Sequence, residues 1–178
     1  MGKNDNQGAA MLKKGVLLVG HGAVAHDCPR ELVVELKSLE ARRSAQGAEP
    51  TVAEKELDQQ IRNWPRTAEN DPYGEGLKAL AERLRPQLGG AELYLAFNEF
   101  CAPTVPEAIE QMIAGGITHV SIVPSMLTPG GVHSEIDIPQ SIEPLRARYP
   151  DVVIRYAWPV DLTLIADMLS SHLSSFSD

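Results

Sequence analysis

The sequence predicts an α/β fold in which a parallel sheet of about four strands lies between two layers of helices. Its apolar runs are short and continuous rather than alternating, which is typical of strands buried on both faces. Stretches with helical spacing separate these runs, and such alternation produces right-handed βαβ crossovers. With 178 residues, the chain can form one compact domain but hardly two.

Four apolar runs predict the strands. Glycine or proline follows most of them and punctuates the pattern, as Gly20 does after the first run and Pro124 after the third. The predicted strands cover residues 16–19, 93–97, 120–123 and 152–156.

Apolar residues at helical spacing predict five helices between and after these strands. Pro29 suits the first turn of the first helix, and Gly115-Gly116 ends the third. The predicted helices cover about 29–43, 76–88, 105–114, 138–148 and 162–173.

Residues 44–72 lengthen the first connection far beyond the usual size of a βα loop. This segment contains a charged stretch at 52–61 that is predicted to be helical, and turn-forming residues follow it. We interpret it as an insertion at the periphery of the sheet. The expected organisation is a flexible tail at 1–12 and a single domain at 13–178.

Composition excludes several classes of protein. The net charge of −8 argues against nucleic acid as the main partner, because phosphate binding requires a basic surface. No apolar stretch approaches the roughly 20 residues of a membrane span, and the polar start lacks the core of a secretory signal. We therefore expect no membrane association and a cytoplasmic location. Cys28 and Cys101 are too far apart for a zinc knuckle or a disulfide framework.

Two histidines and a carboxylate follow three of the predicted strands. His21 follows the first strand between Gly20 and Gly22, Glu99 follows the second, and His133 follows the loop after the third. Because ligands bind beyond the carboxyl ends of parallel strands, we expect these side chains to converge. Imidazole and carboxylate ligands suit Co²⁺, Fe²⁺, Ni²⁺ and Zn²⁺. Three ligands leave positions open, as a site that passes its metal on requires.

Each of these residues also has a plainer interpretation. Either histidine alone could simply hydrogen-bond its own loop or face solvent, and Glu99 could cap the helix that begins near Pro103. Glu135 is interpreted as a surface carboxylate. The remaining histidines (His26, His119 and His172) are not expected to take part in the site.

Three stretches resemble the sirohydrochlorin chelatase family, in its short, single-domain cobaltochelatase or ferrochelatase form. Residues 17–22 (Leu-Leu-Val-Gly-His-Gly) are similar to the first-strand motif with its metal-binding histidine. Residues 96–108 are similar to the second-strand motif, and 123–139 to the third, with the second metal-binding histidine. The chain departs from the family at Ala23-Val24, where Ser-Arg is usual, and at Ala102, where an acidic residue is frequent.

The resemblance implies a chelatase-like half-domain that works as a homodimer, with a tetrapyrrole in the cleft. It implies a lyase-type enzyme that inserts cobalt or iron (Co²⁺ or Fe²⁺, with Ni²⁺ also possible) into sirohydrochlorin or a related macrocycle. The metal ion is then a substrate, and no organic cofactor is expected. In this reading His21 and His133 bind the metal, and Glu99 accepts a pyrrole proton or supplies a third ligand.

The same resemblance implies contacts to the macrocycle from Gly22 and from the loop Pro129, Gly130 and Gly131. Sirohydrochlorin carries eight carboxylates, so an acidic chain needs basic residues to meet them. Arg30 is the main candidate, with Arg62 and Arg66 as others if the insertion forms a basic lid. A solvated, charge-balanced helix is the alternative for the insertion.

Three alternative functions stay open at this point. A non-catalytic metal or tetrapyrrole carrier could use the same histidines without turnover. A histidine-phosphatase-like enzyme would need an arginine where Gly20 stands, to clamp its phosphate. A flavodoxin-like module would have no chemistry at this edge.

Overall fold

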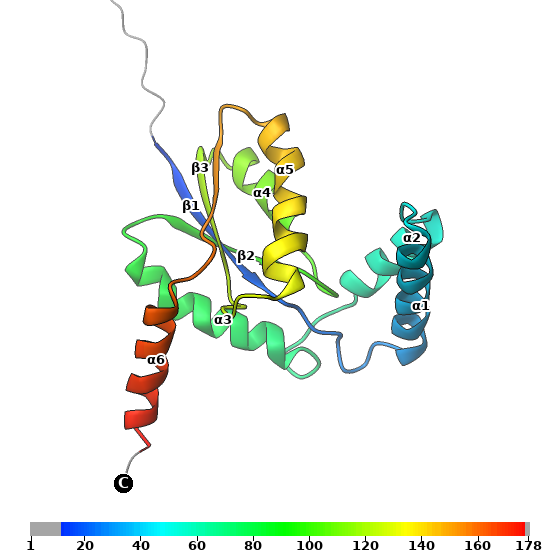
Figure 1. Ribbon diagram of the computed structural model, residues 1–178, viewed down its shortest axis with the longest axis horizontal. Coiled ribbons are helices and arrows are strands. Elements are labelled where there is room, and N and C mark those ends of the chain that lie inside the picture. The colour runs from blue at the N-terminus through cyan, green and yellow to red at the C-terminus, as the bar shows by residue number, and fades with distance from the viewer. Residues whose placement is uncertain (1–11, 177–178) are drawn as a thin grey trace, which may run out of the picture.

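The computed structural model describes residues 12–176, so nearly all of the predicted tail at 1–12 lies outside the described residues. Four strands form one parallel sheet in the order β2-β1-β3-β4 (Figure 1). The prediction of four parallel strands between helices is confirmed. The strands are β1 Lys14–Gly20, β2 Glu92–Phe97, β3 His119–Pro124 and β4 Val153–Tyr156.

Six α-helices accompany the sheet: α1 Arg30–Gln46, α2 Val52–Arg62, α3 Pro72–Leu84, α4 Val105–Ala114, α5 Ile138–Arg148 and α6 Leu162–Ser174. The predicted helix at 76–88 is displaced. It begins at Pro72 because the Asp71 carboxylate caps it, accepting a bond of 2.9 Å from the Gly74 amide. It ends at Leu84, before a short 3₁₀ turn that contains Pro86.

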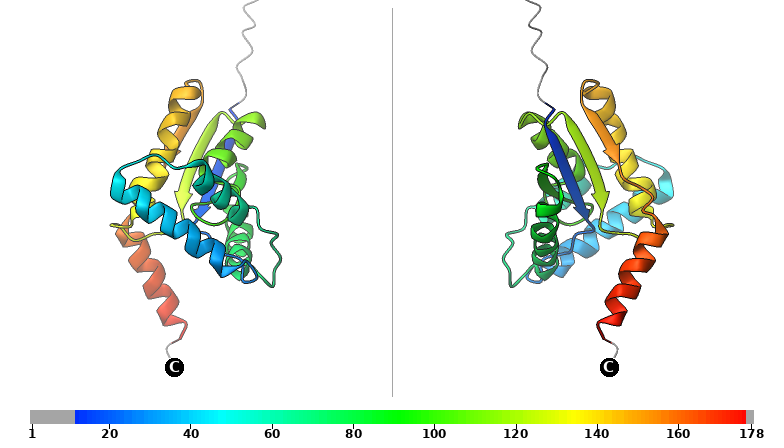
Figure 2. Two further views of the ribbon diagram at one scale, coloured as in Figure 1. Left: turned by 90° about the vertical axis from the view of Figure 1, so that its right-hand side faces the viewer. Right: turned by 90° about the vertical axis from the view of Figure 1, so that its left-hand side faces the viewer.

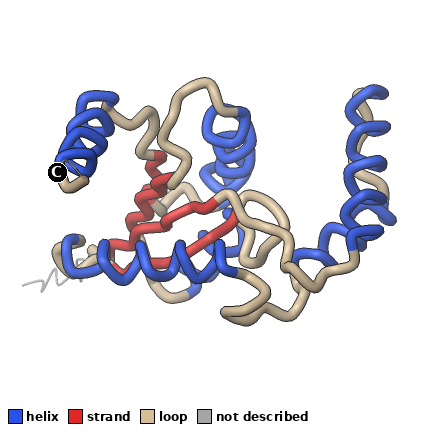
Figure 3. The backbone as a smooth tube through the Cα atoms, turned by 90° about the horizontal axis from the view of Figure 1, so that it is seen from below, coloured by secondary structure: helices blue, strands red, loops and turns tan. Residues whose placement is uncertain are grey.

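Helices α4 and α5 cover one face of the sheet. Leu17, Val19 and Ile122 point toward this face, where they are fully buried against Ile109 and Ile142. The alternate residues of β1 point the other way, where Leu18 packs against α3. Figure 3 shows the strands between these helix layers. The apolar runs are continuous because both faces of the central strands are covered.

The connection between β1 and β2 contains three helices. Of these, α3 covers the sheet and α1 does not. Helices α1 and α2 form an antiparallel hairpin that projects from the domain (Figures 1 and 2). Leu36 of α1 is buried against Leu57 and Ile61 of α2, and Arg43 pairs with the buried Glu54 at 2.7 Å. The predicted insertion at 44–72 thus contributes the second half of this hairpin.

Helix α6 follows β4 and projects beyond the carboxyl edge of the sheet (Figures 1 and 2). Several of its apolar side chains are exposed, including those of Leu162, Leu164, Met168 and Leu169. Among the described residues, no helix is both long and apolar enough to span a bilayer.

Candidate metal centre

The loops after β1 and β2 continue the pairing of their strands. The Asn98 amide donates to the Gly20 carbonyl at 2.9 Å, and the Glu99 amide donates to the His21 carbonyl at 2.8 Å. Gly22 allows this close approach: it has φ +93°, and a Cβ there would lie 1.9 Å from the Glu99 carbonyl oxygen. Gly22, which the resemblance placed against the macrocycle, therefore packs against the neighbouring loop.

His21 is fixed from two directions. Its backbone amide donates to the Tyr73 hydroxyl of α3 at 2.7 Å. Its Nδ1 lies 2.8 Å from the Gly22 carbonyl, an acceptor only, so Nδ1 carries the ring proton. Nε2 of His21 is then the nitrogen free to bind a metal.

His133 lies on a π-helical turn, His133–Asp137, which leads directly into α5. Single π turns inside helices are frequent at functional sites. The helical backbone begins before the predicted start at 138, because Asp137 is itself helical and its side chain makes no capping hydrogen bond. Its Oδ2 instead lies 2.7 Å from Nδ1 of His133.

Nδ1 of His133 is also 2.7 Å from the side-chain amide of Asn98. One ring nitrogen cannot donate to Asp137 and accept from Asn98 at once. The carboxylate is the stronger partner, so Nδ1 carries the proton and the Asn98 amide turns its oxygen toward it. This arrangement leaves Nε2 of His133 free, in the manner of a carboxylate-oriented metal ligand.

The three predicted residues come together. His21, Glu99 and His133 each place one potential ligand atom within 4.8 Å of the others, and among the described residues they form the group that could hold a metal ion. The two imidazole rings stand edge to face, with centroids 4.7 Å apart. Ligand atoms around one ion with bonds of about 2.1 Å stand roughly 3–3.5 Å apart, so small side-chain rotations suffice to close the site. All three side chains are partly exposed, which leaves access for an incoming ion.

Glu99 has a cationic neighbour that the sequence did not indicate. Lys37 of α1 places its ammonium 3.2 Å from Glu99 Oε1 and 3.0 Å from Glu40 Oε2. The ammonium also lies 4.8 Å from the centre of the Phe100 ring. Burial opposes the charge of Lys37, but its hydrogen bonds to Glu40 and Glu99 and the attraction of both carboxylates outweigh it and raise the pKa of Lys37.

Arg62 and Arg66 are half-buried and bond to the protein's own backbone. Arg62 donates to the carbonyls of Asn98 and Cys101 at 3.1 and 3.2 Å. Arg66 joins the two site loops, because it donates to the carbonyl of Ala23 at 2.6 Å and to that of Phe100 at 2.5 Å. Their guanidinium groups brace the loops that carry His21 and Glu99. Whether the two arginines also meet substrate carboxylates stays a prediction.

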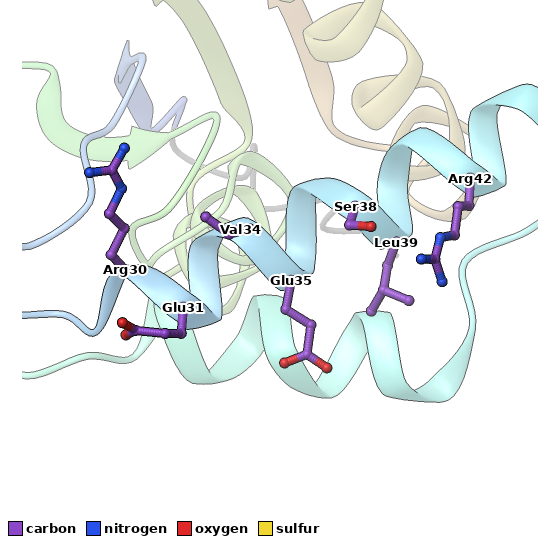
Figure 4. Close-up of a pocket in the computed structure, with 7 residues that line it drawn as sticks. All are labelled: Arg30, Glu31, Val34, Glu35, Ser38, Leu39 and Arg42. Atoms are coloured by element: carbon purple, nitrogen blue, oxygen red, sulfur yellow. The ribbon is translucent and has the colours of Figure 1, made fainter.

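The predicted substrate-contact residues lie on two separate surfaces. Pro129, Gly130 and Gly131 are exposed in the loop before His133, and the Gly130 amide donates to Glu135 at 2.7 Å. Glu135 thus closes its own loop. Arg30 is exposed on α1 and borders a hollow of about 570 Å³ along that helix (Figure 4). No residue of the histidine cluster lines that hollow.

A second hollow, of about 330 Å³, opens beside the cluster. Glu99, Asp137 and Arg62 border it, together with Asn98 and the first turn of α4. It provides space next to the metal-binding atoms for part of a larger ligand.

Sequence reasoning missed four residues that orient the cluster: Lys37, Tyr73, Asn98 and Asp137. Asp137 had a usable signal, since it stands four residues after His133, where a helical neighbour lies. The sequence analysis places the start of the helix at 138, so it does not put His133 and Asp137 on the same helical turn. The other three meet the site only through tertiary packing.

The fold and the cluster define a class of protein: a parallel α/β domain with an open site of two histidines and a glutamate at the carboxyl edge of its sheet. The family model described as CbiX matches residues 68–175, more than half of the chain. The chain belongs to the CbiX family.

Two curated relatives are sirohydrochlorin ferrochelatases. That of Priestia megaterium is 33% identical over 97 residues, which are 54% of this chain and 36% of the relative. That of Bacillus subtilis (strain 168) is 34% identical over 68 residues, which are 38% of this chain and 26% of the relative. The chain thus spans about a third of the length of the curated relatives it matches.

Among solved structures, SirB from Bacillus subtilis with Fe³⁺ aligns with a TM-score of 0.48 and 22% identity, covering 81% of this chain and 39% of that chain. A putative cobalamin biosynthesis CbiX protein from Marinobacter aquaeolei VT8 aligns with a TM-score of 0.49 and 20% identity, covering 91% of this chain and 98% of that chain.

Proposed function

We propose that this protein is a tetrapyrrole metal chelatase that inserts Co²⁺ or Fe²⁺ into sirohydrochlorin or a related macrocycle. The observation that carries the proposal is the cluster of His21, Glu99 and His133, with both imidazoles oriented by hydrogen bonds at Nδ1. Membership of the CbiX family and the names of the curated relatives support the same reaction. The metal ion is a substrate.

In the proposed mechanism, the two imidazoles bind the ion through Nε2 and hold it at the carboxyl edge of the sheet. Both are neutral when they do so, because protonated imidazole has no lone pair for a metal. Three protein ligands leave coordination positions open, so the pyrrole nitrogens can replace the protein ligands one at a time.

Insertion releases two protons from the pyrrole nitrogens as the metal–nitrogen bonds form. Glu99 is the carboxylate of the cluster and accepts the first of these protons in this proposal. Its Oε1 pairs with the Lys37 ammonium at 3.2 Å, which holds the carboxylate beside the two imidazoles. Solvent takes up the second proton, since the site is partly exposed.

The macrocycle is proposed to lie against the exposed loop of Pro129, Gly130 and Gly131, with Arg30 meeting one of its carboxylates. Gly22 is buried against the Glu99 loop, so the predicted contact from Gly22 is not part of this proposal. An Arg30→Ala variant then has a raised KM for the macrocycle and an unchanged kcat. An unchanged KM would remove Arg30 from the substrate surface.

We further propose a homodimer. The exposed apolar side chains of α6, including Leu164 and Met168, support an interface there, since monomers rarely leave such a surface uncovered. Sedimentation equilibrium of the full chain tests this: a dimer that dissociates in a Leu164→Asp, Met168→Asp variant is expected, and a monomeric wild type would contradict it. The cytoplasmic location stays a prediction.

The experiment that tests the function is an anaerobic insertion assay followed by the visible spectrum. Wild-type protein, His21→Ala and His133→Ala are compared with sirohydrochlorin and Co²⁺, and then with Fe²⁺ and Ni²⁺. His119→Ala is the matched control, because His119 lies at the amino end of β3, outside the cluster. The proposal expects acceleration over the protein-free reaction, lost in both cluster variants and kept in the control. Metal binding without acceleration would identify a non-catalytic carrier instead.

A further inference from the structure

Lys37 stands next to the cluster on a helix that contributes none of the metal-binding residues. It comes from the projecting α1/α2 hairpin, whereas His21, Glu99 and His133 follow strands of the sheet. Its ammonium contacts the same carboxylate that would bind the ion, at 3.2 Å from Glu99 Oε1. An ion that uses this oxygen therefore has to displace Lys37 from it.

The Lys37 ammonium has a second ion-pair partner besides Glu99. Glu40, one helical turn further along α1, holds it at 3.0 Å, and the Phe100 ring lies 4.8 Å away. Phe100 has a φ of +58°, the one positive value among the described residues other than glycine, and it packs with the hairpin. Lys37 can thus leave Glu99 while it keeps Glu40 as its partner.

The ion pair between Lys37 and Glu99 is weak enough for a metal ion to replace Lys37 at the carboxylate. The side chains of Lys37 and Glu99 are 42% and 25% exposed, so their pairing is screened by water. Exposed ion pairs of this kind contribute little to stability. A fixed positive charge next to a divalent ion also repels it, by an amount that falls as salt is added.

We propose that Lys37 is a positioning residue that competes with the metal for Glu99 and so keeps the site weak enough to release its ion. Without the ammonium, the cluster of two neutral imidazoles and a carboxylate has a net charge of −1 and holds a divalent ion more tightly. With it, the cluster is neutral overall, and the returning ammonium helps to expel the ion. This inference rests on the proposed function for the identity of the site.

The test is a titration of the full-length protein with Co²⁺ alone, followed by the visible absorption of the bound ion. Lys37→Gln removes the charge, and Lys37→Arg keeps it. Lys78→Gln is the matched control, because Lys78 pairs with Glu75 at 2.7 Å on the exposed side of α3, away from the cluster. Release is measured as the rate at which bound Co²⁺ transfers to an excess of a strong chelator.

The proposal expects Lys37→Gln to bind Co²⁺ roughly three- to tenfold more tightly and to release it more slowly by a similar factor. The difference from wild type shrinks as ionic strength rises, which a merely structural role would not produce. Lys37→Arg and Lys78→Gln stay close to wild type. Unchanged or weaker binding in Lys37→Gln, or the same tightening in Lys78→Gln, would overturn the proposal.

The titration contains no macrocycle, so its outcome is separable from that of the insertion assay. A protein whose Co²⁺ affinity depends on Lys37 but which inserts no metal retains this inference and loses the proposed activity. A protein that inserts metal but whose Co²⁺ affinity does not depend on Lys37 retains the proposed activity and loses this inference.

Discussion

The two loops that carry the histidines are held in different ways. The His21 loop is fixed by its backbone: the amide and carbonyl of His21 are bonded to Tyr73 and Glu99, and Gly22 packs directly on the next loop. The His133 turn is anchored by the buried Ser134, whose carbonyl accepts from the Tyr156 hydroxyl, but the His133 ring itself is oriented by the side chains of Asp137 and Asn98. We therefore expect that changes to the backbone around His21 destabilise the fold, whereas changes to the side chain that orients the His133 ring act mainly on metal binding.

Gly22→Ala should give the largest effect. The new methyl group would stand 1.9 Å from the Glu99 carbonyl oxygen, at a φ of +93°. We expect a loss of about 3 kcal/mol or more in the free energy of unfolding, measured by urea denaturation. Gly130→Ala, with φ +89° but open space around it, is the matched substitution in the other loop and should lose only about 1–2 kcal/mol. Equal losses would remove the distinction between the loops.

Arg66→Met should give the next largest effect. It removes the hydrogen bonds to the carbonyls of Ala23 and Phe100 and leaves the buried Asp71 without its ion pair at 3.2 Å. A loss of about 2–3 kcal/mol in stability is expected. Arg85→Met, which breaks an exposed pair with Glu82, should lose less than about 1 kcal/mol. If both arginines proved equally dispensable, Arg66 would not be a brace.

Asp137→Asn tests the half of the site that side chains orient. Asparagine lacks the charge that holds the proton on Nδ1 of His133, so Co²⁺ affinity should fall roughly ten- to hundredfold. Stability should change by less than about 0.5 kcal/mol, since the residue is on the surface of the π-helical turn. Asp151→Asn, in an exposed turn before β4, is the control and should alter neither quantity. A large loss of stability with intact metal binding would reverse the interpretation.

Tyr73→Phe should lower the free energy of unfolding less than Gly22→Ala or Arg66→Met does. It leaves the His21 amide without its acceptor, which costs about 1 kcal/mol in thermal or urea unfolding. Tyr94→Phe removes a hydroxyl that donates to the exposed Glu92, so it should cost less. A control as destabilised as the test variant would mean that the bond to His21 adds nothing specific.

The strands and most of the helices could be predicted because their apolar patterns are local. The convergence of His21, Glu99 and His133 followed from topology, since all three stand after parallel strands. The hairpin could not be predicted, because Leu32, Val33 and Leu36 on α1 suit packing against either a sheet or another helix. The braces were hidden for a related reason: nothing in a sequence distinguishes Arg66, which binds two carbonyls, from an arginine that faces solvent.

In the proposed centre, one metal ion is bound by both His21 and His133, which lie on two loops that are held in different ways. X-ray absorption of the Co²⁺-loaded protein counts imidazole ligands and tests this most directly. We expect two imidazole ligands in the wild type and one in each of His21→Ala and His133→Ala. A Co²⁺ spectrum with no imidazole contribution, or one unchanged by both substitutions, would contradict it.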